Sequence, residues 1–109
     1  MTTPTPGPAE LLRERLTLVS ALSALNAEAL KLIQRLGAVE MDVLRLELES
    51  DREGTSPELV RLLHEAEVEA EAIRAGQVRC DADIATVEAQ VDEIDRRLAS
   101  GGNGREERT

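Results

Sequence analysis

The residues with the clearest capacity for chemistry lie just past the middle of the chain. His64 is the only histidine, and Glu67 and Glu71 follow it by three and seven residues. On a helix this spacing places all three side chains on one face. An imidazole and two carboxylates are side chains that hold divalent metal ions. The first half of the chain offers no clear complementary ligands, so a metal site at His64 remains an alternative and no metal or cofactor is predicted.

The dipeptide His64-Glu65 is similar to the phospho-acceptor pair of the dimerisation helices of histidine kinases, which are also hairpins. That family carries its histidine on the first helix. Here the segment RLLHEA, residues 61–66, belongs to the second predicted helix. The resemblance implies phosphotransfer at His64, which stands beside the metal site as an alternative function.

The single cysteine, Cys80, falls at an apolar position of the predicted helical pattern. This position favours a buried hydrophobic role over a reactive thiol. One thiol makes no internal disulfide and no structural zinc site. Two long helices supply no nucleophile elbow or oxyanion loop, and the sequence has no glycine-rich phosphate loop. We therefore predict that the chain is not an enzyme.

The composition narrows the possible partners. The 109 residues include 22 Asp and Glu against 13 Lys and Arg, a net charge of −9, and no aromatic residue. Nucleic-acid binding requires cationic surface and commonly uses aromatic stacking, so no nucleic acid is expected as a partner. The sequence has no run of 18 apolar residues and no Sec-type signal, so we predict no transmembrane segment and a cytoplasmic location.

Proline and glycine divide the chain into a few segments. Residues 1–7 are rich in Thr and Pro and are predicted to be a flexible lead-in. A helical hairpin is predicted over residues 8–99, with one helix over 8–53, a turn at 54–56 and a second helix over 57–99. Residues 100–109 contain several glycines and are predicted to be a disordered tail.

The predicted turn has a well-defined chemistry. Gly54 suits the left-handed conformation that ends a helix. Two frames remain open for the start of the next helix. Thr55 and Glu58 form a capping box in one frame, and Ser56 caps a helix with Pro57 at its first position in the other.

Apolar residues recur at alternating spacings of three and four along both predicted helices, which is typical of a coiled coil. In the first helix the series is Leu11, Arg15, Leu18, Leu22, Leu25, Ala29, Leu32, Leu36, Val39, Val43 and Leu46. In the second it is Leu59, Leu63, Ala66, Ala70, Ile73, Gln77, Cys80, Ile84, Val87, Val91, Ile94 and Leu98. We call these two series the seam.

The two series can be folded onto each other about the predicted turn. Layers form between positions whose numbers sum to 109, such as Leu36 with Ile73 and Ala29 with Cys80. Turn chemistry and hydrophobic register are independent signals, and they agree. The predicted fold is all-α, an antiparallel helical hairpin of the coiled-coil type.

The first helix carries a second apolar stripe beside its seam, which a lone hairpin would leave in water. Its interaction residues are predicted to be Leu12, Leu16, Val19, Leu30, Ile33 and Leu44. Covering the stripe favours assembly of two hairpins into a four-helix bundle, or pairing with a helix of another protein. The expected partners are therefore a second copy, giving a homodimer, or another protein's helix.

The predicted function is a non-enzymatic protein–protein interaction module that acts in assembly, as an adaptor or as a regulatory factor. The second helix is the more acidic, with a net charge of −6 over residues 56–99 against −2 over residues 8–50. The overall plan is similar in size and shape to the helical-hairpin substrates of type VII secretion, although the Trp-x-Gly turn motif of that family is absent. A small secreted effector or chaperone-like factor is therefore the alternative.

Overall fold

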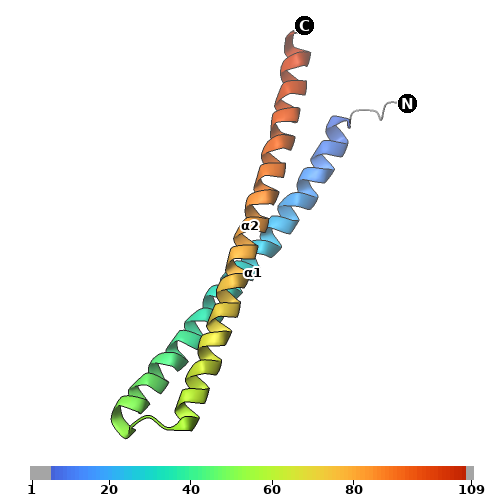
Figure 1. Ribbon diagram of the computed structural model, residues 1–109. Coiled ribbons are helices and arrows are strands. Elements are labelled where there is room, and N and C mark those ends of the chain that lie inside the picture. The colour runs from blue at the N-terminus through green and yellow to red at the C-terminus, as the bar shows by residue number, and fades with distance from the viewer. Residues whose placement is uncertain (1–5, 108–109) are drawn as a thin grey trace, which may run out of the picture. The chain divides into compact units, whose positions relative to one another are not determined.

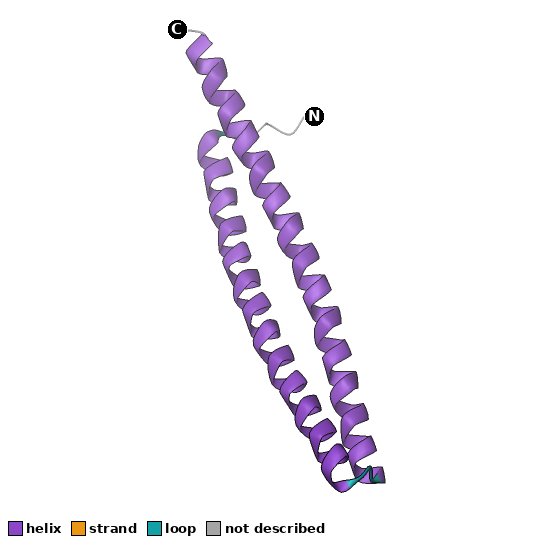
Figure 2. Ribbon diagram, turned by 90° about the vertical axis from the view of Figure 1, so that its left-hand side faces the viewer, coloured by secondary structure: helices purple, strands orange, loops and turns teal. Residues whose placement is uncertain are grey.

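The computed structural model describes residues 6–107, with side-chain surroundings described as far as residue 101. Two helices account for this part of the chain, α1 over Pro8–Glu53 and α2 over Pro57–Glu107 (Figure 1). The described residues contain no strand, as Figure 2 also shows. The all-α hairpin class predicted from the sequence is confirmed. Of the lead-in expected over residues 1–7, residues 1–5 lie outside the described residues.

The loop between the helices follows the predicted turn chemistry. Gly54 adopts a φ of +88°, which is easily reached only without a Cβ, and its N–H donates a hydrogen bond to the carbonyl oxygen of Ser50 at 2.9 Å. The Ser56 hydroxyl accepts a hydrogen bond from the N–H of Leu59 at 3.2 Å. Ser56 is therefore the N-cap, which decides between the two capping frames, and the hydroxyl of Thr55 lies 2.7 Å from that of Ser50 instead.

The far end of α2 differs from the predicted boundary. The helix continues to Glu107, past the end expected near residue 99, and so includes residues 100–107 of the predicted tail. The glycines of this segment weaken a helix by about 1 kcal/mol each, but they keep their N–H groups and do not block the backbone hydrogen bonds.

The chain divides into two compact units. One unit comprises residues 27–81, which contain the loop and the adjoining parts of α1 and α2. Its core is the best buried part of the described chain. The buried apolar residues here are Leu32, Val39, Leu46, Leu59, Ala70, Ile73 and Cys80, and all belong to the predicted seam. Ile73, at 2% exposure, is the most deeply buried of them.

The other unit comprises the beginning of α1, up to residue 26, and α2 from residue 82 onward. Leu11 and Ile94 are its buried residues, at 6% and 3% exposure. Arg15, a polar position of the seam, extends its guanidinium to Asp95, with Nε 2.7 Å from Oδ1. Because Asp95 adjoins Ile94, the residue predicted to lie opposite Arg15, this contact supports the predicted register.

The seam prediction holds throughout the described residues. Every seam position in both units is buried or half-buried. In the unit of residues 27–81 the register is supported a second time, because Ala29 and Cys80 line the same small pocket. A Cβ built on Gly76 would lie 3.6 Å from Leu32 Cδ2, which places these two backbones across the seam from each other.

Candidate interaction surface

The residues predicted to mediate interactions are mostly exposed, and they fall in both units. In the unit that contains the helix ends, Leu12 and Leu16 are 56% and 68% exposed. Val19 in the same unit is half-buried.

In the unit of residues 27–81 the predicted residues Leu30, Ile33 and Leu44 are 55%, 59% and 49% exposed. Sequence reasoning assigned no role to Met41 and Leu48, which are also exposed, at 65% and 53%. Together with Gly37 these residues make one continuous stripe, which we call the outer face of α1. Its members are Leu30, Ile33, Gly37, Met41, Leu44 and Leu48.

The outer face follows the geometry of a straight helix. Its successive spacings are three, four, four, three and four residues, an average of 3.6, so all its members lie along one side of α1. Five large aliphatic side chains, each about half exposed, amount to an apolar area on the order of several hundred Å². Patches of this size on a monomer are often functional.

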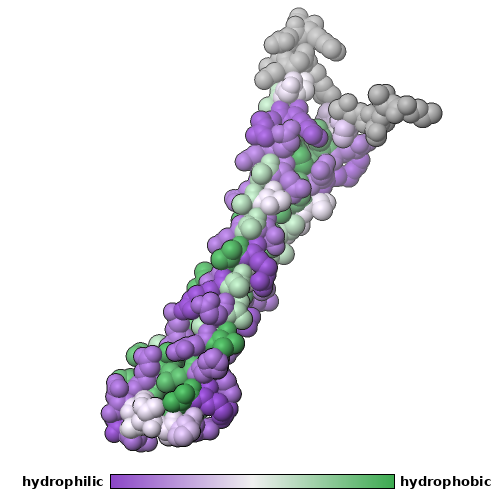
Figure 3. Space-filling model, viewed as in Figure 1, coloured by the Kyte–Doolittle hydropathy of each residue, from purple (hydrophilic) through white to green (hydrophobic). Residues whose placement is uncertain are grey.

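The two helices differ strongly in how much apolar side chain they expose. Among the described residues, α1 has seven large exposed hydrophobic side chains, whereas α2 has three valines, Val60, Val68 and Val78. Green apolar patches also reach the surface between purple charged residues on the face shown in Figure 3. Among the described residues, helix α1 therefore exposes the larger share of apolar side chains.

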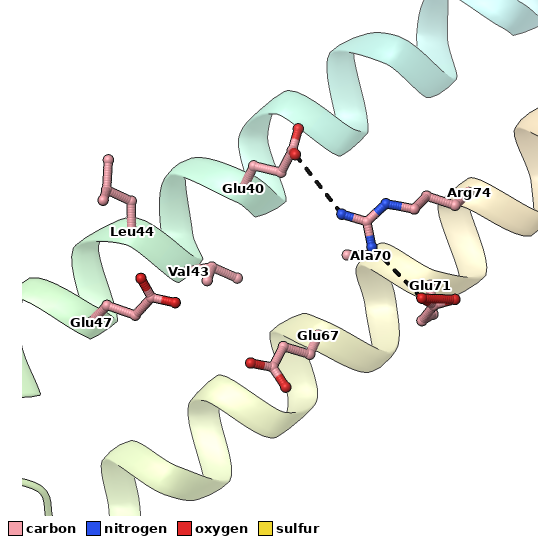
Figure 4. Close-up of a pocket in the computed structure, with 8 residues that line it drawn as sticks. All are labelled: Glu40, Val43, Leu44, Glu47, Glu67, Ala70, Glu71 and Arg74. Atoms are coloured by element: carbon pink, nitrogen blue, oxygen red, sulfur yellow. Dashed lines mark ion pairs between the residues drawn. The ribbon is translucent and has the colours of Figure 1, made fainter.

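A groove between α1 and α2 runs along one edge of the outer face (Figure 4). Its lining residues are Glu40, Val43, Leu44 and Glu47 from α1 and Glu67, Ala70, Glu71 and Arg74 from α2. Arg74 is the only cation among them, and its guanidinium nitrogens lie 3.9 Å from a carboxylate oxygen of Glu40 and 3.8 Å from one of Glu71. With four carboxylates and one guanidinium among its lining side chains, the groove is negatively charged.

Ion pairs along the exposed side of α2 hold several charged groups in place. Arg61 donates hydrogen bonds to Glu58 and to Glu65. The pKa of Arg61 is raised, mainly by its hydrogen bond to Glu58 and by the negative charge of that carboxylate. A hydrogen bond from Arg96 holds the pKa of Glu93 below its ordinary value. These pairs lie on one helix at spacings of three and four, so they support α2 without forming a binding site.

The remaining chemically capable residues lie at different places on α2. His64 is exposed on α2, and Cys80 is 6% exposed in the core. Gln77 is half-buried at the seam and lines the small pocket beside Cys80. No three His, Cys, Asp or Glu residues in the described part of the chain are grouped so that they could hold a metal ion.

Helix α1 also meets a criterion for membrane spans that is based on length and composition. An 18-residue window within it has a mean hydropathy of 1.4, and 6% of that window is buried. By length and composition alone, this helix is sufficient to cross a membrane. Core helices and signal sequences near an N-terminus meet the same criterion. The expectation of no transmembrane segment stays a prediction.

Comparison with known proteins gives no further guide to the surface. No protein-family model, no curated protein and no solved structure matches the chain.

Proposed function

We propose that the protein is a non-enzymatic interaction module that binds a helix of another chain through the exposed apolar residues of α1. The observation that carries this proposal is the asymmetry between the helices. Helix α1 already contributes a full seam to its own hairpin, yet exposes seven further large hydrophobic side chains among the described residues. A hairpin needs only the seam, so the additional apolar surface is accounted for by a second interface.

A helix is the partner that this surface fits best. The outer face is narrow and follows one side of α1, and a second helix can cover such a stripe along its whole length. Burial of apolar area stabilises the pair by about 25 cal/mol per Å² before the cost of association is subtracted. A second copy supplies a matching stripe, and two hairpins joined in this way make a four-helix bundle.

The charges of the two helices support an interface on α1. Residues 56–99 carry a net charge of −6, against −2 for residues 8–50. Two copies that meet through α1 keep their more acidic helices on the outside, where water and salt screen them. An interface formed through α2 would instead bring the stronger negative charges together.

The test compares two double substitutions that change charge equally. Leu30→Glu with Ile33→Glu alters the outer face of α1. Val68→Glu with Val78→Glu makes the same change on α2, where both valines are more than half exposed. The purified wild-type chain is expected to sediment with a mass above its 11.9 kDa monomer or to bind a partner helix, and the α1 variant is expected to lose this property.

The control variant on α2 should keep the wild-type mass and helix content, because it leaves the outer face intact. Circular dichroism should show that the α1 variant is still largely helical. Equal mass and equal partner binding for wild type and the α1 variant would contradict the proposal. Flotation of the wild-type chain with neutral lipid vesicles, lost in the α1 variant, would assign the outer face to a membrane and would equally overturn it.

A further inference from the structure

The outer face of α1 has edges of opposite charge near the loop. Met41, Leu44 and Leu48 have the spacing of the a, d and a positions of a heptad. Glu40 and Glu47 then occupy the g positions on one edge, and Arg45 and Arg52 occupy the e positions on the other. All four charged residues are exposed. Positions e and g are the ones whose charges set partner and orientation in helix pairs.

The spacing across the stripe is the same in both heptads. Arg45 follows Glu40 by five residues, and Arg52 follows Glu47 by five residues. When two identical helices pair in parallel, each g residue faces the e residue five positions further along the partner helix. Glu40 would then face Arg45 of the second copy, and Glu47 would face its Arg52. In an antiparallel pair g faces g and e faces e, so acid would meet acid and arginine would meet arginine.

The contacts within the chain leave these groups available. Glu40 reaches Arg74 only at 3.9 Å, and its side chain is 58% exposed. Arg45 reaches Asp42 only at 3.6 Å, and its side chain is 68% exposed. Neither pair is within ordinary hydrogen-bonding distance. A charged group from a partner can therefore replace these contacts at little cost.

The groove beside the outer face reinforces the same orientation. Glu40 and Glu47 lie on the edge that borders α2, where Glu67 and Glu71 add two further carboxylates and Arg74 supplies a single cation (Figure 4). In a parallel pair the arginine edge of the second copy comes to this groove. The groove thus offers an excess of carboxylates where the partner brings guanidinium groups, which form the strongest charge-assisted pairs with carboxylates.

We propose that the outer face of α1 is covered by α1 of a second copy of this chain in parallel orientation, with Glu40 paired to Arg45 and Glu47 paired to Arg52 between copies. This inference rests on the proposed function of α1 as an interaction helix, and it adds the identity of the partner and the register. Residues 40–71 carry eleven acidic and three basic residues, a net charge of −8, so two such regions repel one another. Salt screens this repulsion beyond about 8 Å under physiological conditions, whereas the contacting edges are screened much less.

Cysteine cross-linking reads the orientation directly. In a Cys80→Ala background, Met41→Cys and Leu48→Cys are tested separately under mild oxidation. In a parallel pair each new thiol lies beside the same thiol of the second copy, so both variants should form a disulfide-linked dimer. In an antiparallel pair the two copies of residue 41 can meet only at the two-fold axis. Residue 48 then lies about 10.5 Å from the axis on each helix, in opposite directions, so its two copies are about 21 Å apart. That separation is far beyond the reach of a disulfide, so at most one variant would cross-link.

Asp42→Cys is the matched control, because Asp42 adjoins Met41 but lies off the outer face; its side chain is 60% exposed. This variant should not cross-link above the level of random collision. Cross-linking at only one of residues 41 and 48, or equal cross-linking at Asp42, overturns the parallel register.

Charge reversal tests the register with Cys80 in place. Glu40→Arg with Glu47→Arg makes both edges basic, and self-association should weaken about tenfold or more, since four ion pairs per dimer become repulsive. Adding Arg45→Glu and Arg52→Glu to the same chain exchanges the edges and should restore the wild-type dissociation constant.

Reversal of two exposed acids elsewhere, Glu69→Arg with Glu88→Arg, changes the net charge equally and should not weaken self-association. No restoration in the fourfold variant overturns the proposed pairs, as does a wild-type chain that stays monomeric. The proposed function of α1 as an interaction helix has its own test. If that function is right, Leu30→Glu with Ile33→Glu abolishes helix binding whatever the orientation of the pair. Loss in that variant without double cross-linking leaves the proposed function standing and refutes the parallel dimer.

Discussion

Replacement of Ile73 by alanine tests whether the seam is the main source of stability. Ile73 is 2% exposed in the unit of residues 27–81, and the substitution removes three buried carbons. At about 0.8 kcal/mol per buried methylene, the transfer loss is about 2.4 kcal/mol. The cavity adds to this loss, and the better helix propensity of alanine offsets a few tenths of a kcal/mol. We expect a destabilisation of about 2–4 kcal/mol.

The assay is urea unfolding followed by circular dichroism, at one protein concentration because self-association itself stabilises the folded state. Val78→Ala is the matched control, since Val78 lies on the same helix and is 70% exposed. Its effect should stay within about 0.5 kcal/mol. If Ile73→Ala costs less than about 1 kcal/mol, or no more than Val78→Ala, the seam is not the packed core and the reasoning from burial fails.

Four further outcomes are expected from the loop, the core and the surface. Gly76→Ala should stabilise the protein by up to about 1 kcal/mol, because a Cβ there meets only ordinary contacts at 3.6 Å or more. Gly54→Ala should destabilise it by about 1–2 kcal/mol because of the φ of +88°; chemical denaturation of both variants checks the signs. Cys80 should react slowly with a bulky thiol reagent in the native protein and quickly in denaturant, and equal rates would contradict its burial. The contribution of Glu93, whose pKa is lowered by Arg96, should be complete above pH 4.5 and lost as the pH falls below it, so the stability difference between wild type and Glu93→Gln should shrink on acidification.

Much of the fold was predictable because two local signals agree with one long-range pattern. Gly54 and Ser56 mark the loop by backbone sterics and capping, and these effects act within a few residues. The alternation of three and four residues then predicts every seam position, because a heptad repeat keeps one side of a helix facing its partner. The end of α2 was not predictable in the same way. Glycines such as Gly101 raise the free energy of a helix without blocking it, so composition alone does not show where the helix stops.

The candidate surface was predicted less completely, for a geometric reason. If spacings of three and four residues strictly alternate, the position of the second stripe after Gly37 is Glu40. This pattern therefore leaves out Met41 and Leu48. The exposed residues instead follow two successive spacings of four, from Ile33 to Gly37 and on to Met41. A search at a period of 3.6 residues would have found this stripe, whereas a search at 3.5 finds the seam.

The difference between the two periods bears on how α1 serves two partners at once. A pattern with a period of 3.6 turns by about 20° per heptad relative to one with a period of 3.5. Along α1 the outer face therefore moves steadily away from the seam as it approaches the loop, from Ile33 towards Met41 and Leu48. Near the loop it is set apart from the seam by Glu40 and Glu47, which line the groove beside α2. A partner helix bound there can contact α1 without displacing α2, so binding of a second chain and folding of the hairpin need not compete for the same side chains.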